Sequence, residues 1–206
     1  MSLFGAACLG LMAACAAAAA TAPTLRVPLV GDDAKDARVQ KYYAGVRERG
    51  GQPLNLHRTL ANAPALMAGR NAAIRYDATV PRAYRELIII RSVQLNGGEY
   101  EQAQHRPMAM SCGLTRPQVD AIARWRTSRL FDPKQRAVLA YAEGISARTG
   151  PSDAVFADMK KHFNDTEIVE LTIAATTYAG DAMFTRALRV PLEPTAGDGS
   201  SAYGKC

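Results

Sequence analysis

The sequence predicts an all-α fold, and three observations support this class. Apolar side chains recur at helical spacing along most of the chain, as in Val39, Tyr42, Tyr43 and Val46. Short turns with glycine or proline separate these segments, and none of them alternates apolar and polar residues as a half-buried strand does. The chain has 206 residues, 48% of them apolar, which is compatible with one ordinary domain, or at most two small ones.

The predicted helices follow one another with short connections. The first covers 32–49 and ends at a glycine pair, and 54–75 holds two weaker helical stretches around Pro64. Proline in the first turn and glycine after the last turn mark several of the later boundaries. These later helices are expected at 81–96, 99–111, 117–125, 132–148, 153–163 and 165–188.

The segment after Pro81 carries the most apolar run of the chain, Leu87-Ile-Ile-Ile90. Such a run is compatible with a helix buried on most sides or with a buried strand. The spacing of the polar residues around it favours the helix, and so does the lack of a partner strand elsewhere. The run therefore predicts a central buried helix.

Both ends of the sequence look like extensions of one folded domain at 32–194. Residues 1–22 are rich in alanine and nearly uncharged, with an apolar stretch and small residues that suit a secretory signal, although a basic start is missing. We expect a periplasmic or secreted protein, with lipid anchoring at Cys15 as a variant, or a cytoplasmic one if the leader is no signal. We expect no integral membrane span, and a flexible tail at 195–206.

Charge and cysteine spacing argue against several classes of function. The net charge is +6, but the basic residues are scattered, and the one cluster around Trp125 carries a single aromatic ring, so nucleic-acid binding is not expected. No Cys-x-x-Cys pair and no Cys/His group with zinc spacing occurs, so we expect no metal site. Spacing does not argue for a disulfide between Cys112 and Cys206.

Residues able to move protons flank the pair Gly97-Gly98. Glu86 lies on the helix before this turn, whereas Glu101 and His105 lie four residues apart on one face of the next helix, with Tyr100 one step round. A carboxylate and an imidazole brought together across a helix pair form an acid/base couple, because the carboxylate orients the ring and favours its protonated form.

Each of these residues also has a simpler interpretation. Glu86 can form an exposed pair with Arg82 four residues earlier, worth about 0.2–0.5 kcal/mol. His105 can be a hydrogen-bonded structural histidine, or can pair with Glu101 on the surface. Tyr100 is more often a packing residue than a chemical one.

Several motifs of this sequence resemble those of one family when they are taken together. They are the runs 85–91, 96–101 with His105, 113–115, 163–171 and 190–194. Over about residues 35–194 the chain resembles the carboxymuconolactone decarboxylase-like / alkyl hydroperoxidase D-like superfamily, in a branch without the Cys-x-x-Cys pair. The resemblance implies an all-α bundle of about seven to eight helices that forms homo-oligomers (dimers, trimers or hexamers), with the site near a subunit contact.

The alkyl hydroperoxidase D branch uses two cysteines that this sequence lacks. The resemblance places that branch's glutamate on Glu86 and its last histidine on His105. Its two cysteines fall on Gly98 and Glu101, and its intervening histidine falls on Tyr100. Because a thiolate is the nucleophile of the peroxidase cycle, dithiol peroxidase activity is not expected.

The decarboxylase branch needs neither cysteines nor a cofactor. The resemblance then implies Glu86 and His105 as acid/base groups and Tyr100 as a hydrogen-bonding partner of the substrate. Glu101 and Arg91 would bind substrate, Arg91 by holding an anionic group. Arg91 can equally be a buried partner of Glu86 or Glu101.

We therefore expect a cofactor-free lyase or isomerase that acts on a small organic acid or lactone. The arginine that many relatives carry on the last helix is absent near Met183, so the namesake substrate does not follow. Two alternatives remain open. One is a peroxidase-like antioxidant protein using Cys112, and the other is a non-catalytic oligomeric binding protein on the same scaffold.

Overall fold

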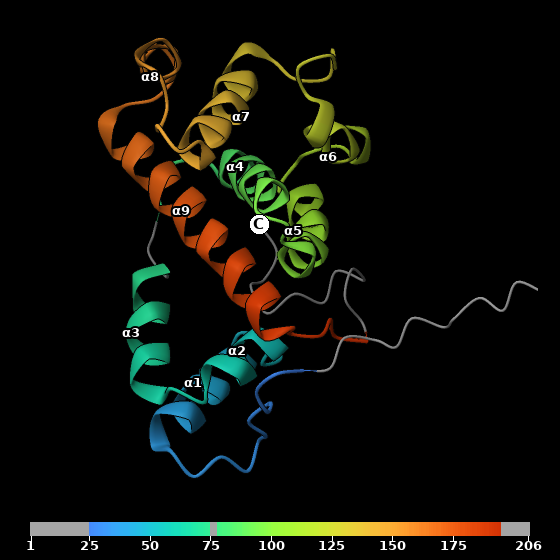
Figure 1. Ribbon diagram of the computed structural model, residues 1–206, viewed down its shortest axis with the longest axis vertical. Coiled ribbons are helices and arrows are strands. Elements are labelled where there is room, and N and C mark those ends of the chain that lie inside the picture. Colours follow the sequence, from blue (N-terminus) through green and yellow to red (C-terminus); the bar gives the residue numbers. More distant parts are fainter. Residues whose placement is uncertain (1–24, 75–77, 195–206) are drawn as a thin grey trace, which may run out of the picture.

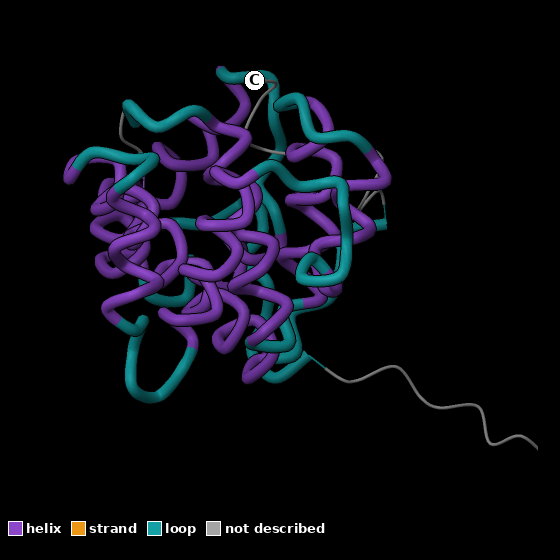
Figure 2. Tube along the Cα trace, turned by 90° about the horizontal axis from the view of Figure 1, so that it is seen from above, coloured by secondary structure: helices purple, strands orange, loops and turns teal. Residues whose placement is uncertain are grey.

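The protein is built from helices alone wherever its structure is described. A computed structural model describes residues 25–74 and 78–194, and within these ranges it contains helices, turns and loops but no strand (Figures 1 and 2). The predicted all-α class is confirmed. The helices are α1 (Ala37–Glu48), α2 (Asn55–Leu60), α3 (Pro64–Ile74), α4 (Arg82–Leu95), α5 (Glu99–Ser111), α6 (Arg116–Ala121), α7 (Pro133–Ser146), α8 (Asp153–Lys160) and α9 (Asp165–Leu188), with a short 3₁₀ turn at Ile122–Arg124.

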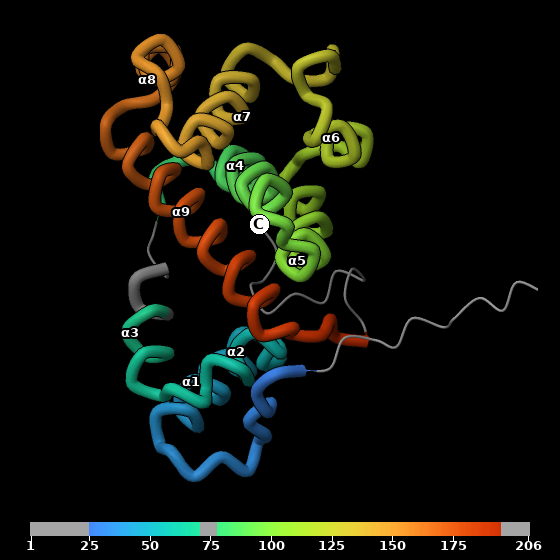
Figure 3. The backbone as a smooth tube through the Cα atoms, viewed as in Figure 1, coloured from blue at the N-terminus to red at the C-terminus, as the bar shows by residue number. Residues whose placement is uncertain are grey.

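Helix α4 lies at the centre of the larger of two groups of helices. Helices α5, α7 and α9 all pack against it, and α8 packs on α7 and α9 (Figure 1). Helices α1 to α3 form a smaller group at the other end, and the long helix α9 runs from one group to the other (Figure 3). The main hydrophobic core is formed by residues of all the helices from α4 through α9. Helices α1 and α3 share a second, small core around Tyr43 and Met67.

Burial on several sides explains why α4 is apolar nearly all round. Its residues Leu87, Ile88, Ile89, Ile90 and Val93 are at most 1% exposed. A strand would need a hydrogen-bonded neighbour, whereas a helix satisfies its own backbone and can be surrounded by other helices. The helical interpretation of this run is confirmed.

Side-chain caps fix the starts of α6 and α7 within one residue of the predicted positions. The Thr115 hydroxyl accepts a hydrogen bond from the backbone N–H of Gln118 at 3.3 Å, and the Asp132 carboxylate accepts one from Gln135 at 2.8 Å. In both cases the Oε1 of the glutamine in turn accepts a hydrogen bond from the backbone N–H of the capping residue, which completes a capping box.

Two predictions about the helices need correction. The first helix begins at Ala37 rather than at residue 32, because Asp36 caps it by accepting a bond from the N–H of Arg38 at 2.9 Å. The described residues contain nine α-helices, whereas the resemblance implied about seven to eight; the two stretches predicted in 54–75 form separate helices, the second starting at Pro64. Proline opens that helix because it needs no partner for a missing N–H.

The C-terminal segment after α9 is tied back to the rest of the fold. One oxygen of the Glu193 carboxylate accepts bonds from the N–H of Asn55 at 2.5 Å and from the Tyr100 hydroxyl at 2.6 Å. Its other oxygen accepts a bond from the Gln104 amide at 2.6 Å. A carboxylate at the first turn of α2 also faces the positive end of that helix. The segment thereby joins α2 to α5.

The terminal extensions lie outside the described residues. This holds for the predicted leader at 1–22, for Cys15 and for the predicted flexible tail at 195–206. Among the helices of the described ranges, none combines the length and hydropathy needed to span a bilayer.

The packing around α4 predicts a large effect for a truncation inside it. Exchanging Ile90, which is 0% exposed, for Ala should lower the free energy of unfolding by about 2–5 kcal/mol, because it leaves a cavity in the core. The same measurement by urea denaturation should give less than about 0.5 kcal/mol for Leu66→Ala, since Leu66 is 74% exposed. Similar losses in the two variants would contradict a core centred on α4.

Candidate functional site

Glu86 is the acidic residue that α4 carries into the core. Its side chain is 0% exposed, and it lies one residue before the apolar run Leu87–Ile90. An ionised carboxylate in such a place is strongly destabilising unless charges and hydrogen bonds compensate it. Glu86 and the groups that compensate its charge therefore form the candidate functional site.

His105 of α5 provides the main compensation. The turn at Gly97, which has a positive φ of 68°, and Gly98 folds α5 back along α4. This brings His105 Nδ1 to 2.8 Å from Glu86 Oε2, and His105 is only 2% exposed. The two side chains thus meet inside the protein, as expected from the helix pair, while their catalytic role stays a prediction.

Arg82 holds the second oxygen of the same carboxylate. Its Nε donates to Glu86 Oε1 at 2.6 Å, so the simple i,i+4 pair forms as well as the contact with His105. Burial alone would raise the pKa of Glu86, but the charge and hydrogen bond of His105, helped by Arg82, outweigh it and hold this pKa below its ordinary value. Glu86 is therefore an ionised group that can only accept hydrogen bonds.

Tyr178 of α9 closes the other side of the imidazole. Its ring meets the His105 ring edge-on, with 4.5 Å between centroids and 79° between planes. Burial, and then the negative charges of Glu86 and Asp181, raise the pKa of the phenol, so it stays protonated. Within the described part of the chain its hydroxyl bonds to no protein group. Nothing in the sequence around Tyr178 reveals that α9 faces α5, so this contact comes from the structure.

A second pair of buried carboxyl groups lies near His105. Glu101 is 2% exposed and Asp181 is 5% exposed. The Thr185 hydroxyl lies 2.9 Å from Glu101 Oε1, and Asp181 forms an ion pair with Arg70 of α3. Burial raises the pKa of both carboxyl groups, and the charge of Asp181 adds to the effect on Glu101. Glu101 does not form the expected surface pair with His105.

Gly98 and Glu101, on which the resemblance places the two cysteines of the peroxidase branch, lie side by side in the structure. A side chain at Gly98 would collide with the Cβ of Ala182 at 2.6 Å and with Glu101 Oε2 at 2.8 Å. The Glu101 carboxylate thus occupies the space beside Gly98. Cys112 lies at the end of α5, about 10 Å along the helix axis from His105, and is disulfide-bonded. The other three cysteines lie outside the described residues.

Tyr100 and Arg91 are engaged elsewhere in the structure. The Tyr100 hydroxyl donates to Glu193 and accepts a bond from the N–H of Leu56 at 3.1 Å. It faces this way because one residue along a helix turns the side chain by about 100° from that of Glu101. The protein itself therefore uses the hydroxyl that was expected to bind substrate.

Arg91 is not a partner of Glu86 or Glu101, and that part of the interpretation is wrong. Its guanidinium bonds the Glu143 carboxylate of α7 at 2.6 and 3.1 Å. Five residues separate Arg91 from Glu86, which turns it about 140° round α4, toward α7. Its expected role in binding an anionic group stays a prediction that this geometry does not support.

Among the described residues, no group of three or more histidine, cysteine, aspartate or glutamate side chains is arranged to hold a metal ion. The candidate site brings together a carboxylate, an imidazole, a phenol and two further carboxyl groups. Proton transfer is what such a set can perform.

The raised pKa of Glu101 makes stability depend on pH in a defined direction. Burial makes the pKa of the Glu101 carboxyl group higher in the folded protein than in the unfolded chain, where it is about 4.3. The fold therefore becomes less stable as the pH rises from the unfolded-state pKa through the folded-state pKa. Glu101→Gln should therefore raise the Tm at pH 8 by a few degrees, and the gain should vanish toward pH 4.

The exposed Glu99, two residues away on α5, provides a matched control. Thermal denaturation of Glu99→Gln should show no such gain that grows with pH. If Glu101→Gln lowered the Tm at pH 8, the ionised carboxylate would be stabilising the fold, and this description of the pair would be wrong.

Comparisons with known proteins agree with this architecture. The model of the carboxymuconolactone decarboxylase family matches residues 61–144, the stretch that contains Glu86 and His105. The uncharacterized protein YdfG of Bacillus subtilis (strain 168) is 25% identical over 100 residues, which are 47% of this chain and 67% of YdfG.

Solved structures show the same fold at low sequence identity. An uncharacterized peroxidase-related protein from Ralstonia eutropha JMP134, with an alkylhydroperoxidase AhpD core, superposes with a TM-score of 0.75 at 17% identity, covering 89% of this chain and 99% of its own. A variant of the debrominase Bmp8, in complex with 2,3,4-tribromopyrrole, gives 0.70 at 19% identity, covering 86% and 96%. The family match over residues 61–144 and the shared helical fold both support assignment of the chain to the carboxymuconolactone decarboxylase / AhpD-like superfamily.

Proposed function

We propose that this protein is a cofactor-free enzyme that moves protons on a small organic acid or lactone, as a lyase or an isomerase. The observation that carries the proposal is the buried contact of 2.8 Å between Glu86 Oε2 and His105 Nδ1. A structural histidine alone would not explain why the core also holds an ionised carboxylate, which is destabilising without such partners.

The roles of the two residues follow from their bonding. Because ionised Glu86 only accepts hydrogen bonds, His105 must carry its proton on Nδ1 and donate it to the carboxylate. In the neutral ring this leaves Nε2 with a free electron pair. Nε2 is then the base, and Glu86 stabilises the imidazolium that forms when Nε2 accepts a proton.

For an isomerase, the steps are a proton removal and a proton return. His105 Nε2 takes a proton from the carbon next to the lactone carbonyl, and the electron pair of that C–H bond moves into the carbonyl to give an enolate. The resulting imidazolium returns the proton to another carbon of the conjugated system. No oxidant, reductant or cofactor is needed.

For a lyase, the enolate arises by loss of carbon dioxide. The C–C bond to the departing carboxylate breaks, and its electron pair moves into the lactone carbonyl. His105, protonated at both nitrogens, then gives the Nε2 proton to carbon. In both reactions we expect the protonated phenol of Tyr178, whose ring contacts the imidazole edge-on, to donate a hydrogen bond to the developing oxyanion. We therefore assign to Tyr178 the substrate contact that the sequence assigned to Tyr100.

The alternative of a peroxidase-like antioxidant protein has less support. The two positions of the cysteine pair hold Gly98 and Glu101, and Cys112 is disulfide-bonded. The bound tribromopyrrole of the debrominase is a small flat ring, comparable in size to the lactones proposed here. The ligand of this structural relative thus supports a small ring as the substrate. Glu86 and His105 of this chain support proton transfer as the reaction type.

The proposal predicts that His105 is needed for turnover rather than for folding. His105→Gln should lower kcat by about 10²-fold or more, because a positioned acid/base group typically contributes that much. The measurement uses a panel of carboxylated γ-lactones in D₂O, with NMR detection of carbon dioxide loss and of deuterium at the carbon next to the carbonyl.

His162, which is half-buried, provides the matched control for the same exchange. His162→Gln should retain full turnover, and thermal denaturation shows whether His105→Gln is still folded. Turnover that survives in folded His105→Gln would contradict the acid/base assignment. Turnover lost in Cys112→Ser, at unchanged Tm, would favour thiol chemistry instead.

A further inference from the structure

Arg82 connects the buried Glu86–His105 pair to the solvent. Its side chain is 32% exposed, whereas that of Glu86 is 0% and that of His105 is 2% exposed. The three side chains are joined through one carboxylate, because Arg82 Nε and His105 Nδ1 contact its two different oxygens. Of these three groups, the guanidinium is therefore the one that a molecule arriving from outside meets first.

The guanidinium of Arg82 uses one of its edges within the protein. An arginine side chain carries five N–H donors in a planar fork. The Nε of Arg82 donates to Glu86 Oε1 at 2.6 Å, and its Nη2 donates to the sulfur of Met108 at 2.8 Å. In the described part of the chain these two groups are its hydrogen-bonding partners. Both contacts involve the edge formed by Nε and Nη2, so the N–H groups at the end of the fork remain for another acceptor.

A carboxylate is the acceptor that fits the end of such a fork. Two parallel N–H groups of a guanidinium bind both oxygens of one carboxylate, and the opposite charges strengthen the two hydrogen bonds. The Glu86 carboxylate does not use the whole positive charge of Arg82, since its second oxygen contacts His105.

An anion at Arg82 would also lie near the phenol of Tyr178. Burial raises the pKa of this phenol most, and the positive charge of Arg82 opposes the rise, so the guanidinium is close enough to act on the ring. The Tyr178 ring contacts the imidazole of His105 edge-on. A ligand held by Arg82 would therefore be next to the groups to which the proposed function assigns the reaction.

We propose that the outer end of the Arg82 guanidinium is a carboxylate-binding site, which selects organic acids for the Glu86–His105 pair. The inference rests on the proposed function for the reaction, but binding at Arg82 can be measured without turnover. The role of holding an anionic group, which the resemblance gave to Arg91, thereby passes to an arginine that contacts the reactive pair.

The carboxylate held by Arg82 is not one that leaves as carbon dioxide. Loss of carbon dioxide removes the negative charge from the departing group, so a guanidinium bonded to that group would stabilise the substrate more than the transition state. The carboxylate at Arg82 consequently stays in the product. Unreactive acids of similar size should then bind at the same place as the substrate.

Binding of 2-furoate, a flat five-membered ring with one carboxylate, tests the site directly. In titrations of the full chain followed by NMR of the His105 imidazole, 2-furoate should bind at least about tenfold more tightly than the uncharged 2-furamide. Arg82→Gln should raise the Kd of 2-furoate at least about tenfold, because two charge-assisted hydrogen bonds are lost. It should change the binding of 2-furamide less than about twofold. Arg82→Lys, which keeps the charge but not the fork, should give an intermediate Kd.

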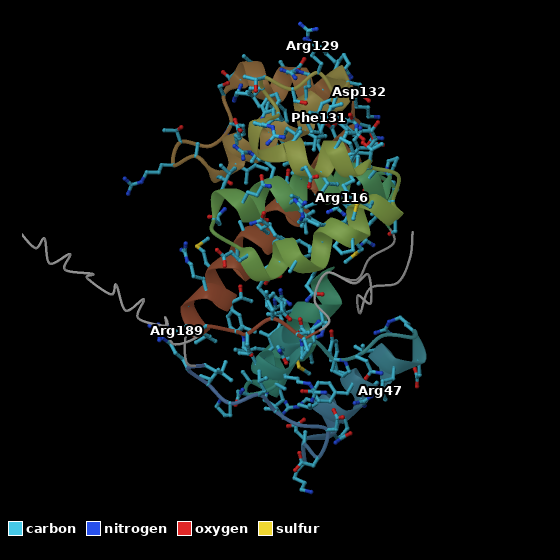
Figure 4. All side chains as sticks on the ribbon, turned by 90° about the vertical axis from the view of Figure 1, so that its right-hand side faces the viewer. Arg47, Arg116, Arg129, Phe131, Asp132 and Arg189 are labelled. Carbon is cyan, nitrogen blue, oxygen red and sulfur yellow. The ribbon has the colours of Figure 1, made fainter. Side chains whose placement is uncertain are left out.

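Arg116, at the start of α6, provides the matched control (Figure 4). Like Arg82 it precedes an acidic partner by four residues, here Asp120, but its side chain is 78% exposed. Arg116→Gln should leave the Kd of 2-furoate unchanged. Thermal denaturation verifies the fold of each variant, and Arg82→Lys, which can still bond Glu86, carries the comparison if Arg82→Gln is unfolded.

Turnover separates this binding site from the proposed reaction. With a carboxylated γ-lactone, Arg82→Gln should raise KM at least about tenfold, and the increase should be much smaller for the corresponding neutral amide. A weaker Glu86–His105 pair would slow both substrates alike, so the difference between them reports the carboxylate contact. If 2-furoate binds as expected but no lactone is converted, the proposed function fails and the binding site stands.

Three results would overturn the carboxylate site while leaving the reaction in place. In the first, 2-furoate does not bind, or binds no better than 2-furamide. In the second, the Kd of 2-furoate is the same in Arg82→Gln or Arg82→Lys as in the unchanged protein. In the third, lactones are converted, but the exchange of Arg82 affects charged and neutral substrates equally.

Discussion

The burial of one carboxylate in the most apolar helix is the constraint on which the rest of this structure depends. Glu86 has no access to water, and it precedes four consecutive large apolar residues of α4. An ion of this kind is strongly destabilising in the interior unless its oxygens are bonded to positive or donating groups. Arg82 satisfies one oxygen from the preceding turn of α4, and His105 satisfies the other from α5.

This constraint explains the geometry of the helix pair. The contact between Glu86 and His105 requires α5 to lie along α4 and to begin soon after it ends, which Gly97 allows through its positive φ. Gly98 is required for a different reason, since Ala182 and the Glu101 carboxylate take the space of any side chain there. The imidazole is therefore held by a bonded carboxylate on one side and by the Tyr178 ring on the other.

Some contacts of this protein can be predicted from its sequence, and others cannot. The helices around the glycine pair, and the meeting of Glu86 with His105, followed from helical spacing and a short turn. The sequence did not predict the partners of Tyr100 and Arg91, because the helices that pack against them come from distant parts of the chain. Tyr100 faces α2 and Glu193, and Arg91 faces Glu143 of α7.

Contacts made by α9 could not be predicted locally at all. The ion pair between Arg70 and Asp181 joins residues 111 positions apart, and the bond between Thr185 and Glu101 joins residues 84 apart. Only the packing of α9 across both groups of helices determines these distances. The same helix carries Tyr178 and Asp181, which lie beside His105 in the candidate site.

The replacement of a thiol pair by glycine and glutamate changes what the scaffold can do. The resemblance implies a proton relay that serves a thiolate in the peroxidase branch, whereas this chain has Glu86 and His105 but holds Gly98 and Glu101 at the expected cysteine positions. In the proposed function the glutamate–histidine pair is the reactive element. Proton transfer to carbon is a reaction that such a pair can perform unaided.

The position of the proton on His105 tests this account most directly. In protein labelled with ¹⁵N-histidine, three imidazoles are visible, and His105→Gln identifies the one of interest. NMR should show a proton on Nδ1 of His105 that exchanges slowly with water at neutral pH, because it is buried and bonded to the Glu86 carboxylate. An Nδ1 without a proton, or one whose proton exchanges freely, would contradict the central role of the Glu86–His105 contact.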